Sequence, residues 1–246
     1  MDNVTILTAP RPREEQESIE KLMALAIFGE KVAAKIYLLC AELQPQYGPL
    51  LTKFGKMEAN HGAWFLDVSR ANGIEPDRAF ADNELSYLLR QVDEHGAKRD
   101  FDALIVVQGF IVESLAIATY ESFLPIAHKY PGTHDIFRKA LEEEHYHVDW
   151  VVRYLRLRYF DAVDEFRGLA ERVNVQGIDC IGGTMMNISE YLDKIGMSGA
   201  YCAGAMMDGY TRLLETVGFE QKDATKHVVA MFMPLIRKYR RGEKTK

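Results

Sequence analysis

Apolar residues recur at spacings of three and four positions along nearly the whole chain, and no run of alternating β-branched residues is bounded by hairpin turns. This pattern predicts an all-α fold. Long helices are expected at residues 16–43, 47–71, 82–95, 100–128 and 133–158, with shorter helices following to about residue 237. The stretch 168–183 is weakly periodic and predicts no definite element.

One domain is expected across residues 1–246, because a chain with 48% hydrophobic residues can bury one sizeable core. Within it, residues 1–15 are expected to form a flexible arm and residues 238–246 a basic tail. The long apolar run has the length of a membrane span, but it contains Gln108, Glu113 and Glu121. A buried core helix is therefore predicted, and no membrane span.

Net charge and cysteine content bear on whether the protein binds nucleic acid and on the compartment in which it works. A formal net charge of -6 and a pI near 5.7 disfavour a nucleic-acid partner. Cys40, Cys180 and Cys202 show no CxxC spacing, so neither a disulfide framework nor a zinc–thiolate site is predicted. The first residues lack the apolar segment of a secretory signal. A cytoplasmic location is expected.

Two predicted helix pairs carry the same arrangement of acidic and histidine residues. In each pair a glutamate on the first helix precedes a Glu-x-x-His motif on the second, by 28 positions in one pair and 31 in the other. The residues are Glu30 with Glu58 and His61, and Glu113 with Glu144 and His147. The helix at 82–95 lies between the pairs, which suits the long crossover of a ferritin-like four-helix bundle with additional helices.

Helical phase directs these polar residues toward the core. Glu58 and His61 share one stripe with Phe54 and Phe65, so they point where the core residues point. Glu113 lies among apolar neighbours, where an ionised carboxylate is costly unless a cation or a proton compensates it.

The last motif allows two registers, Glu142 with His145 or Glu144 with His147. The apolar stripe of this helix includes positions 144 and 147, whereas positions 142 and 145 lie with charged residues. We therefore predict that Glu144 and His147 face the core. Glu142, Glu143 and His145 are expected on a solvated face or behind the core-facing residues.

Four carboxylates and two neutral imidazoles balance the charge of two divalent ions, which explains how so many acids can be buried together. The same arrangement occurs in ferritin-like di-iron and di-manganese proteins. Mixed oxygen and nitrogen ligands without thiolates favour iron or manganese over structural zinc. The predicted cofactor is two Fe ions, with Mn as an alternative at one site. The predicted ligands are Glu30, Glu58, His61, Glu113, Glu144 and His147.

These motifs and several of their neighbours resemble those of the cyanobacterial aldehyde-deformylating oxygenases, also called aldehyde decarbonylases. The resemblance spans about residues 19–231 and is specific at the predicted metal site. The matching features are Gly29-Glu30, Lys56-Met-Glu-x-x-His61-x-x-x-Phe65, Gln108, Ala116-Ile-Ala-x-Tyr120, Pro125, Glu142-Glu-Glu-x-x-His147 and Val217-Gly-Phe219.

The resemblance implies a role for each matching residue. Glu30 and Glu113 are expected as terminal carboxylates, Glu58 and Glu144 as bridging ones, with one imidazole on each metal. It also implies O2 as a co-substrate and an external electron donor, either a protein or a small reductant. Three further residues match positions near the site and are candidate catalytic residues, although ordinary packing or hydrogen bonding to a buried neighbour would also explain them. They are Tyr37, Gln108 and Tyr120.

Three departures from the family pattern fall around the predicted cavity. Glu121, Phe123 and His145 stand where the family usually has Asn, Tyr and Tyr. An added carboxylate in the wall would disfavour an alkyl chain. We therefore expect a di-iron oxygenase for N-oxygenation of a small amine, hydroxylamine or hydrazine. The alternative is deformylation of an aldehyde to formate and a hydrocarbon one carbon shorter. An iron-storage or ferroxidase protein is a third hypothesis.

Overall fold

The computed structural model describes the chain from residue 11 to residue 240, except for the side chains of residues 174–182, 186, 231, 234–236 and 238–240. Helices follow one another along this part, and it contains no strand, which confirms the all-α prediction. The elements are α1 (Arg13–Leu43), α2 (Gly48–Ala71), α3 (Arg78–Ala97), α4 (Phe101–Val106), η1 (Val107–Val112), α5 (Glu113–Phe123), η2 (Leu124–Lys129), α6 (Thr133–Arg158), α7 (Val163–Ile195), α8 (Gly199–Thr216) and α9 (Gln221–Arg240).

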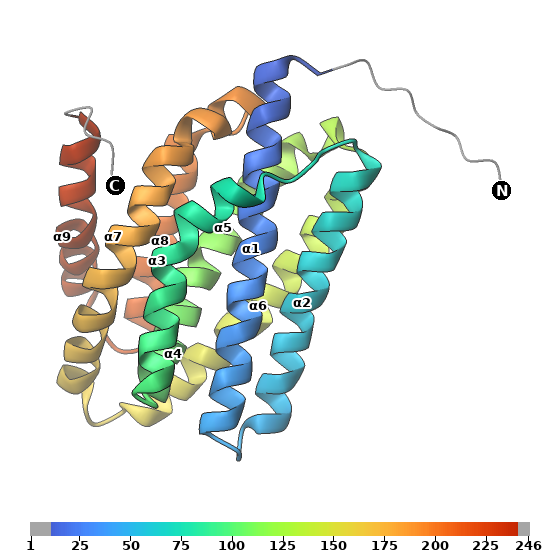
Figure 1. Cartoon of the computed structure of the whole chain (residues 1–246). Helices are drawn as coiled ribbons and strands as arrows, with labels where there is room; N and C mark the ends of the chain where they lie inside the picture. The colour runs from blue at the N-terminus through green and yellow to red at the C-terminus, as the bar shows by residue number, and fades with distance from the viewer. Residues whose placement is uncertain (1–10, 241–246) are drawn as a thin grey trace.

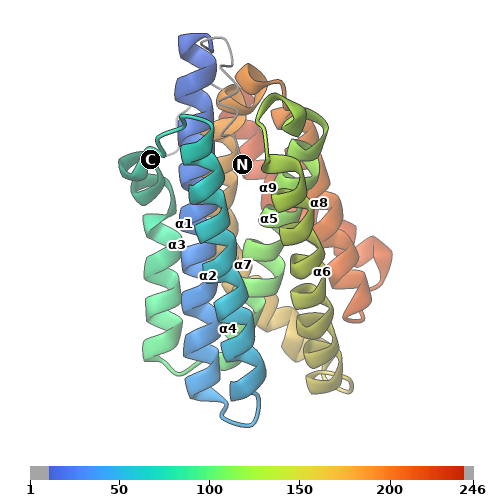
Figure 2. The same cartoon turned by 90° about the vertical axis from the view of Figure 1, so that its right-hand side faces the viewer.

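The bundle is built from the two predicted helix pairs. Helix α1 packs against α2, and α5 packs against α6, while contacts between α2 and α6 and between α1 and η1 join the pairs. Figure 1 shows α1 and α2 side by side, and Figure 2 shows α6 on the other side of the bundle. Helix α3 crosses over after α2 and packs on α1, as the four-helix bundle requires.

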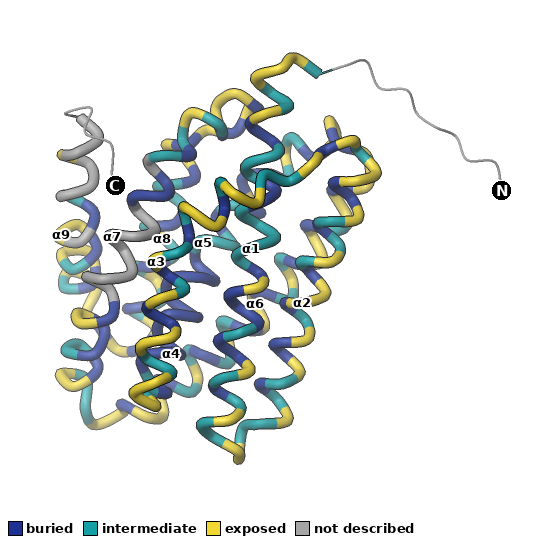
Figure 3. Tube along the Cα trace, in the orientation of Figure 1, coloured by how far each residue is buried: buried dark blue, intermediate teal, exposed yellow. Residues whose placement is uncertain are grey.

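Helices α7, α8 and α9 cover the second side of the bundle. Helix α7 packs on α1 and α3, α8 packs on α5, and α9 packs on both α7 and α8. Figure 3 shows the buried residues concentrated where these helices meet the bundle. The weakly periodic stretch 168–183 lies inside α7, which runs without a break from Val163 to Ile195.

Several helix starts differ from the sequence expectation for local chemical reasons. Helix α3 begins at residue 78 because the side chain of Asp77 accepts a hydrogen bond from the backbone N–H of Phe80 at 3.0 Å. Helix α1 begins at Arg13, inside the expected arm 1–15, where Glu14 and Glu15 favour the positive end of the helix dipole. Expectations for residues 1–10 and 241–246 lie outside the described residues.

The predicted helix at 100–128 forms a nearly continuous helical run with two irregular segments. It passes from α4 into the π-helix η1 directly before Glu113 and ends in the 3-10 helix η2. Within the described residues, the run Phe101–Lys129 is the one segment long and apolar enough to cross a membrane. Since 78% of its most apolar stretch of 18 residues is buried inside the fold, this run is a core helix of the bundle.

Candidate metal centre

The six predicted ligands converge in the middle of the bundle. They come from four helices: one from α1, two from α2, one from the first residue of α5 and two from α6. None of their side chains is more than 3% exposed. The structure therefore brings together Glu30, Glu58, His61, Glu113, Glu144 and His147.

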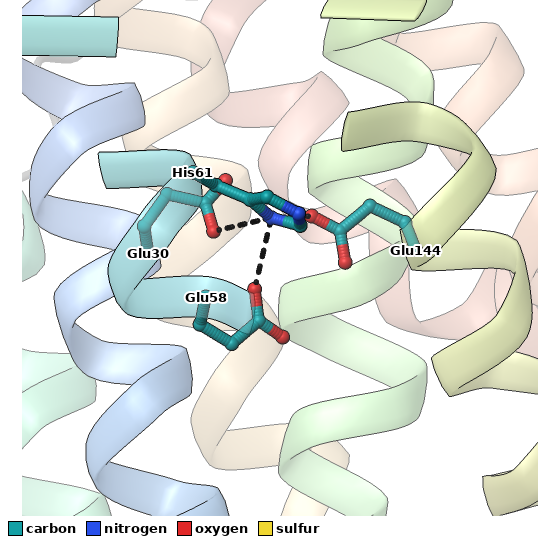
Figure 4. A group of neighbouring side chains, drawn as sticks. All are labelled: Glu30, Glu58, His61 and Glu144. Carbon is teal, nitrogen blue, oxygen red and sulfur yellow. Dashed lines mark hydrogen bonds and ion pairs between the residues drawn. The ribbon is translucent and has the colours of Figure 1, made fainter. Parts of the chain in front are cut away.

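These residues form two overlapping groups of potential ligands. Each group contains three carboxylates and one imidazole, whose ligand atoms all lie within 4.8 Å of one another. Glu58 and Glu144 belong to both groups, Glu30 and His61 only to the first, and Glu113 and His147 only to the second. Figure 4 shows the first group, with Glu30, Glu58 and Glu144 around the ring of His61. Such sharing is the geometry expected of two metals with two bridging carboxylates.

Each imidazole points its Nδ1 atom at three carboxylate oxygens. His61 Nδ1 lies 3.2 Å from Glu144 Oε1, 3.3 Å from Glu30 Oε2 and 3.4 Å from Glu58 Oε2. A cation placed among these atoms would receive one nitrogen and three oxygen ligands.

The second group repeats this arrangement around the other imidazole. His147 Nδ1 lies 3.1 Å from Glu58 Oε1, 3.1 Å from Glu144 Oε2 and 3.6 Å from Glu113 Oε1. The two groups together therefore offer the mixed oxygen and nitrogen environment that iron and manganese favour.

Glu58 shows most clearly that this cluster fits a cation. The side chain is completely buried, and among the described residues neither carboxylate oxygen accepts a hydrogen bond of good geometry, although His147 Nδ1 and His61 Nδ1 lie 3.1 Å and 3.4 Å away. A buried polar group left unpaired costs about 1–3 kcal/mol, and a charged one costs more. A divalent ion between Glu58 and its neighbours would satisfy both oxygens.

The pKa values of the cluster differ between its carboxylates. Burial would raise the pKa of Glu58, but His147 and His61 lower it to about 2. Burial raises the pKa of Glu30 to about 8, although His61 opposes the shift. Burial and the nearby Glu113 hold the pKa of Glu144 well above its usual value. Burial alone would lower the pKa of His147, but contacts with Glu113, Glu144 and Glu58 outweigh it and raise that pKa to about 12. Without a cation the cluster retains protons, which metal binding would displace.

The three other candidate residues hold the outer carboxylates in place. The Tyr37 hydroxyl donates to Glu113 Oε1 at 2.8 Å, and the Gln108 amide donates to the same oxygen at 2.9 Å. The Tyr120 hydroxyl donates to Glu30 Oε1. Burial raises the pKa of both tyrosines well above the ordinary value, so both remain neutral donors. A catalytic role for these three residues stays a prediction.

Glu143 has a specific partner that the sequence did not reveal. The Nε2 atom of His61 lies 2.9 Å from Glu143 Oε2, which leaves Nδ1 free to face the carboxylates. His147 has no such support, since its Nε2 is buried without a partner in the described part of the chain. The sequence left Glu143 either on a solvated face or behind the core-facing residues, because no spacing along α6 shows which side chain of α2 it meets; the contact with His61 supports the second alternative.

Replacing Glu143 by glutamine is expected to weaken metal binding about 10- to 100-fold at the site containing His61, because a neutral amide supports the imidazole less well. The site containing His147 keeps its affinity. Glu142→Gln is the matched control, since Glu142 pairs with Arg138 on the surface. Iron titration of both variants checks this expectation. Equal affinities in the two variants would refute a supporting role for Glu143.

His145 and Glu121 lie away from the cluster. Both side chains are exposed and line a separate groove between α5, α6 and α8, whereas Glu144 and His147 are buried. The expectation that Glu121 walls the cavity beside the metals is therefore wrong. It follows Glu113 by eight positions on a helix that places it well around the axis from that residue.

The cavity beside the cluster has apolar walls contributed by α1, α3, α5 and α7. It encloses about 80 Å³, and the buried carboxylates form one side of it. Its apolar lining includes Leu22, Leu25, Leu85, Leu88, Val112, Leu115 and Ile188. The side chains of Thr119, Tyr120 and Thr184 add a few polar groups. The expected polar pocket is thus replaced by one whose walls are mostly apolar.

Comparisons with known proteins show the family and the fold of this chain. The family model described as "Long-chain fatty aldehyde decarbonylase" matches residues 14–233. A solved structure described as "Protein 19 with aldehyde deformylating oxidase activity from Synechococcus" is similar with a TM-score of 0.82 at 23% sequence identity. The similarity covers 91% of this chain and 98% of that one, so the two proteins share one fold.

Proposed function

Because this chain belongs to the long-chain fatty aldehyde decarbonylase family, we propose that it converts an aldehyde and O2 to formate and a hydrocarbon one carbon shorter. Membership confirms the expectation of a non-haem di-iron oxygenase, an oxidoreductase. The choice of an aldehyde rests on the family and on the apolar cavity beside the cluster. One oxygen atom of O2 then enters formate and the other leaves as water, so the reaction takes up four electrons and the accompanying protons from outside, which suits a protein donor or a small reductant.

We assign the metal-binding roles from the overlap of the two groups. Glu58 and Glu144 would bridge two irons because each belongs to both groups. Glu30 and Glu113 would be terminal ligands, with His61 on one metal and His147 on the other. When bound, the metal pair supplies the capacity to reduce O2. Two irons are the proposed content, and manganese at one site is the alternative.

The chain's own residues would hold the substrate and keep water out. Leucines from α1 and α3 line the cavity beside the buried carboxylates, so an alkyl chain packed there would direct its aldehyde group toward the cluster. Hydrogen bonds from Tyr37 and Gln108 to Glu113, and from Tyr120 to Glu30, would keep these two carboxylates in one orientation while the aldehyde reacts.

The observation that favoured N-oxygenation does not hold in the structure. That hypothesis depended on Glu121 lying in the cavity wall, and Glu121 lines a different groove. The family match supports aldehyde deformylation instead and describes an enzyme rather than an iron store.

A product assay tests the proposed function. Iron-loaded protein with a reductant and O2 is expected to release formate and the shortened hydrocarbon from medium- and long-chain aldehydes, in equal amounts. In parallel reactions, hydroxylamines and hydrazines are expected to give no oxygenated nitrogen product. Nitrogen oxidation without formate release from any aldehyde would reverse the assignment and restore the first expectation.

A further inference from the structure

Two large apolar side chains protrude where α6 ends. Leu157 is 77% exposed and Phe160 is 78% exposed, the highest values among the large apolar residues of the described part. They lie within four positions of each other, around the last residue of α6 and the turn toward α7. Exposed apolar side chains are common singly, whereas two large ones so close in sequence are candidates for a surface that meets another apolar phase.

The last two turns of α6 carry positive charge beside Leu157. The last two turns of α6 contain three arginines, Arg153, Arg156 and Arg158, and no acidic residue, while Asp161, Asp164 and Glu165 follow in the turn and at the start of α7. Arg158 approaches Asp102 at 3.4 Å. Arg153 and Arg156 are exposed and make no ion pair within the described residues. Their charges are therefore available to an anionic surface.

Amphipathic aromatic residues complete this end of the bundle. A surface groove of about 290 Å³ is lined by Tyr47, Trp150, Arg153, Tyr154, Leu157 and Arg158. The rings of Trp150 and Tyr154 stack with centroids 5.6 Å apart. Tyr47 places the groove beside the turn between α1 and α2, which lies at the lower end of the bundle in Figure 2. Tyrosine, tryptophan and arginine are the side chains that favour the boundary between lipid and water.

We propose that this end of the bundle binds reversibly to the surface of a membrane that contains anionic lipids. Leu157 and Phe160 would enter the outer edge of the acyl region, while Arg153 and Arg156 contact lipid phosphates. The groove beside Trp150 would take one headgroup. This proposal rests on the exposed surface alone, although long-chain aldehydes, the proposed substrates, would themselves partition into a bilayer.

Vesicle flotation of the full, iron-loaded chain tests the proposal. Binding is expected to vesicles that mix phosphatidylcholine with phosphatidylglycerol, to weaken as salt is added, and to be much weaker with phosphatidylcholine alone. Arg153→Gln combined with Arg156→Gln is expected to reduce the partition coefficient roughly 25-fold, since each basic residue near such a surface contributes about 1 kcal/mol. Leu157→Ser combined with Phe160→Ser is expected to reduce it at least about tenfold.

Matched controls lie on other surfaces of the protein. Leu38→Ser with Val229→Ser removes two exposed apolar side chains, and Lys31→Gln with Lys222→Gln removes two exposed charges. Both controls are expected to bind vesicles as the original chain does. All four double variants should keep aldehyde turnover in detergent. If the original chain turns over no aldehyde, the vesicle assay still tests the membrane proposal, because it does not depend on activity.

Three results would overturn the proposal, the first two of them in the flotation assay. They are binding that does not distinguish anionic from neutral vesicles, and no binding at all. The third is a concentration-dependent dimer in gel filtration that Leu157→Ser with Phe160→Ser dissociates, without vesicle binding, since this would assign the surface to a second copy of the chain.

Discussion

Glu144→Ala is expected to empty both metal sites and His147→Ala one of them, whereas His145→Ala keeps the full metal content. Glu144 belongs to both ligand groups, and His147 supplies the nitrogen of only one. His145 is exposed and faces a groove on the other side of α6, so its loss removes no ligand. Activity should follow metal content and fall below detection in the Glu144 variant.

Metal analysis after iron loading and desalting measures this difference, and circular dichroism checks that each variant remains helical. His145→Ala is the matched control, because it removes an imidazole from the same turn of the same helix. Loss of metal in His145→Ala with retention in His147→Ala would contradict the assignment of Glu144 and His147 and move the ligand roles to Glu142 and His145.

Gly29→Leu is expected to reduce turnover of long-chain aldehydes about 100-fold while both metals stay bound. Gly29 lines the cavity next to Glu30, and a Cβ built on it meets nothing within 4 Å. A leucine side chain would therefore occupy the space proposed for the alkyl chain. The helix itself should tolerate the change, since glycine in a helix interior is about 0.5–1 kcal/mol less favourable than alanine.

Gly204→Leu provides the control for this variant. Gly204 is also helical, a Cβ on it also meets nothing within 4 Å, and it lines the groove between α5, α6 and α8 rather than the cavity. Steady-state assays across aldehyde chain lengths, with iron content measured in parallel, compare the two. Unchanged turnover in Gly29→Leu, or an equal loss in Gly204→Leu, would place the substrate elsewhere.

The ligand cluster could be predicted because metal binding restricts residue spacing along single helices. A Glu-x-x-His motif places both side chains on one face, and the apolar phase of α6 selected Glu144 and His147 over Glu142 and His145. The buried carboxylates also required compensation, which pointed to cations. The structure places all six residues as these arguments expected, while their metal binding awaits measurement.

Contacts between distant helices could not be predicted in this way. Periodicity predicted a helix at residues 82–95 but not that Leu85 and Leu88 line the cavity together with Ile188 of α7. Nor could it show that Glu143 meets His61. The direction of Glu121 was predicted wrongly, because one residue's angle around a helix axis does not tell which neighbour it faces.

Irregular helix geometry could not be predicted from hydrophobic spacing either. The π-helix before Glu113 rotates the residues that follow it relative to a regular helix, and hydrophobic spacing alone did not reveal this. Gly109, within that segment, packs so closely on Val151 that a side chain there would clash. Gly177, a residue type that favours a helix break, is instead accommodated inside the continuous helix α7.

The most direct test of the central claim is the metal content of the chain itself. Protein loaded with ferrous iron under anaerobic conditions and then desalted is predicted to retain close to two irons per chain, because the six buried residues form two overlapping groups of ligands. Exposure of this reduced protein to O2 should change its absorbance. Iron content near zero, with no response to O2, would contradict the account of the cluster as a di-iron centre.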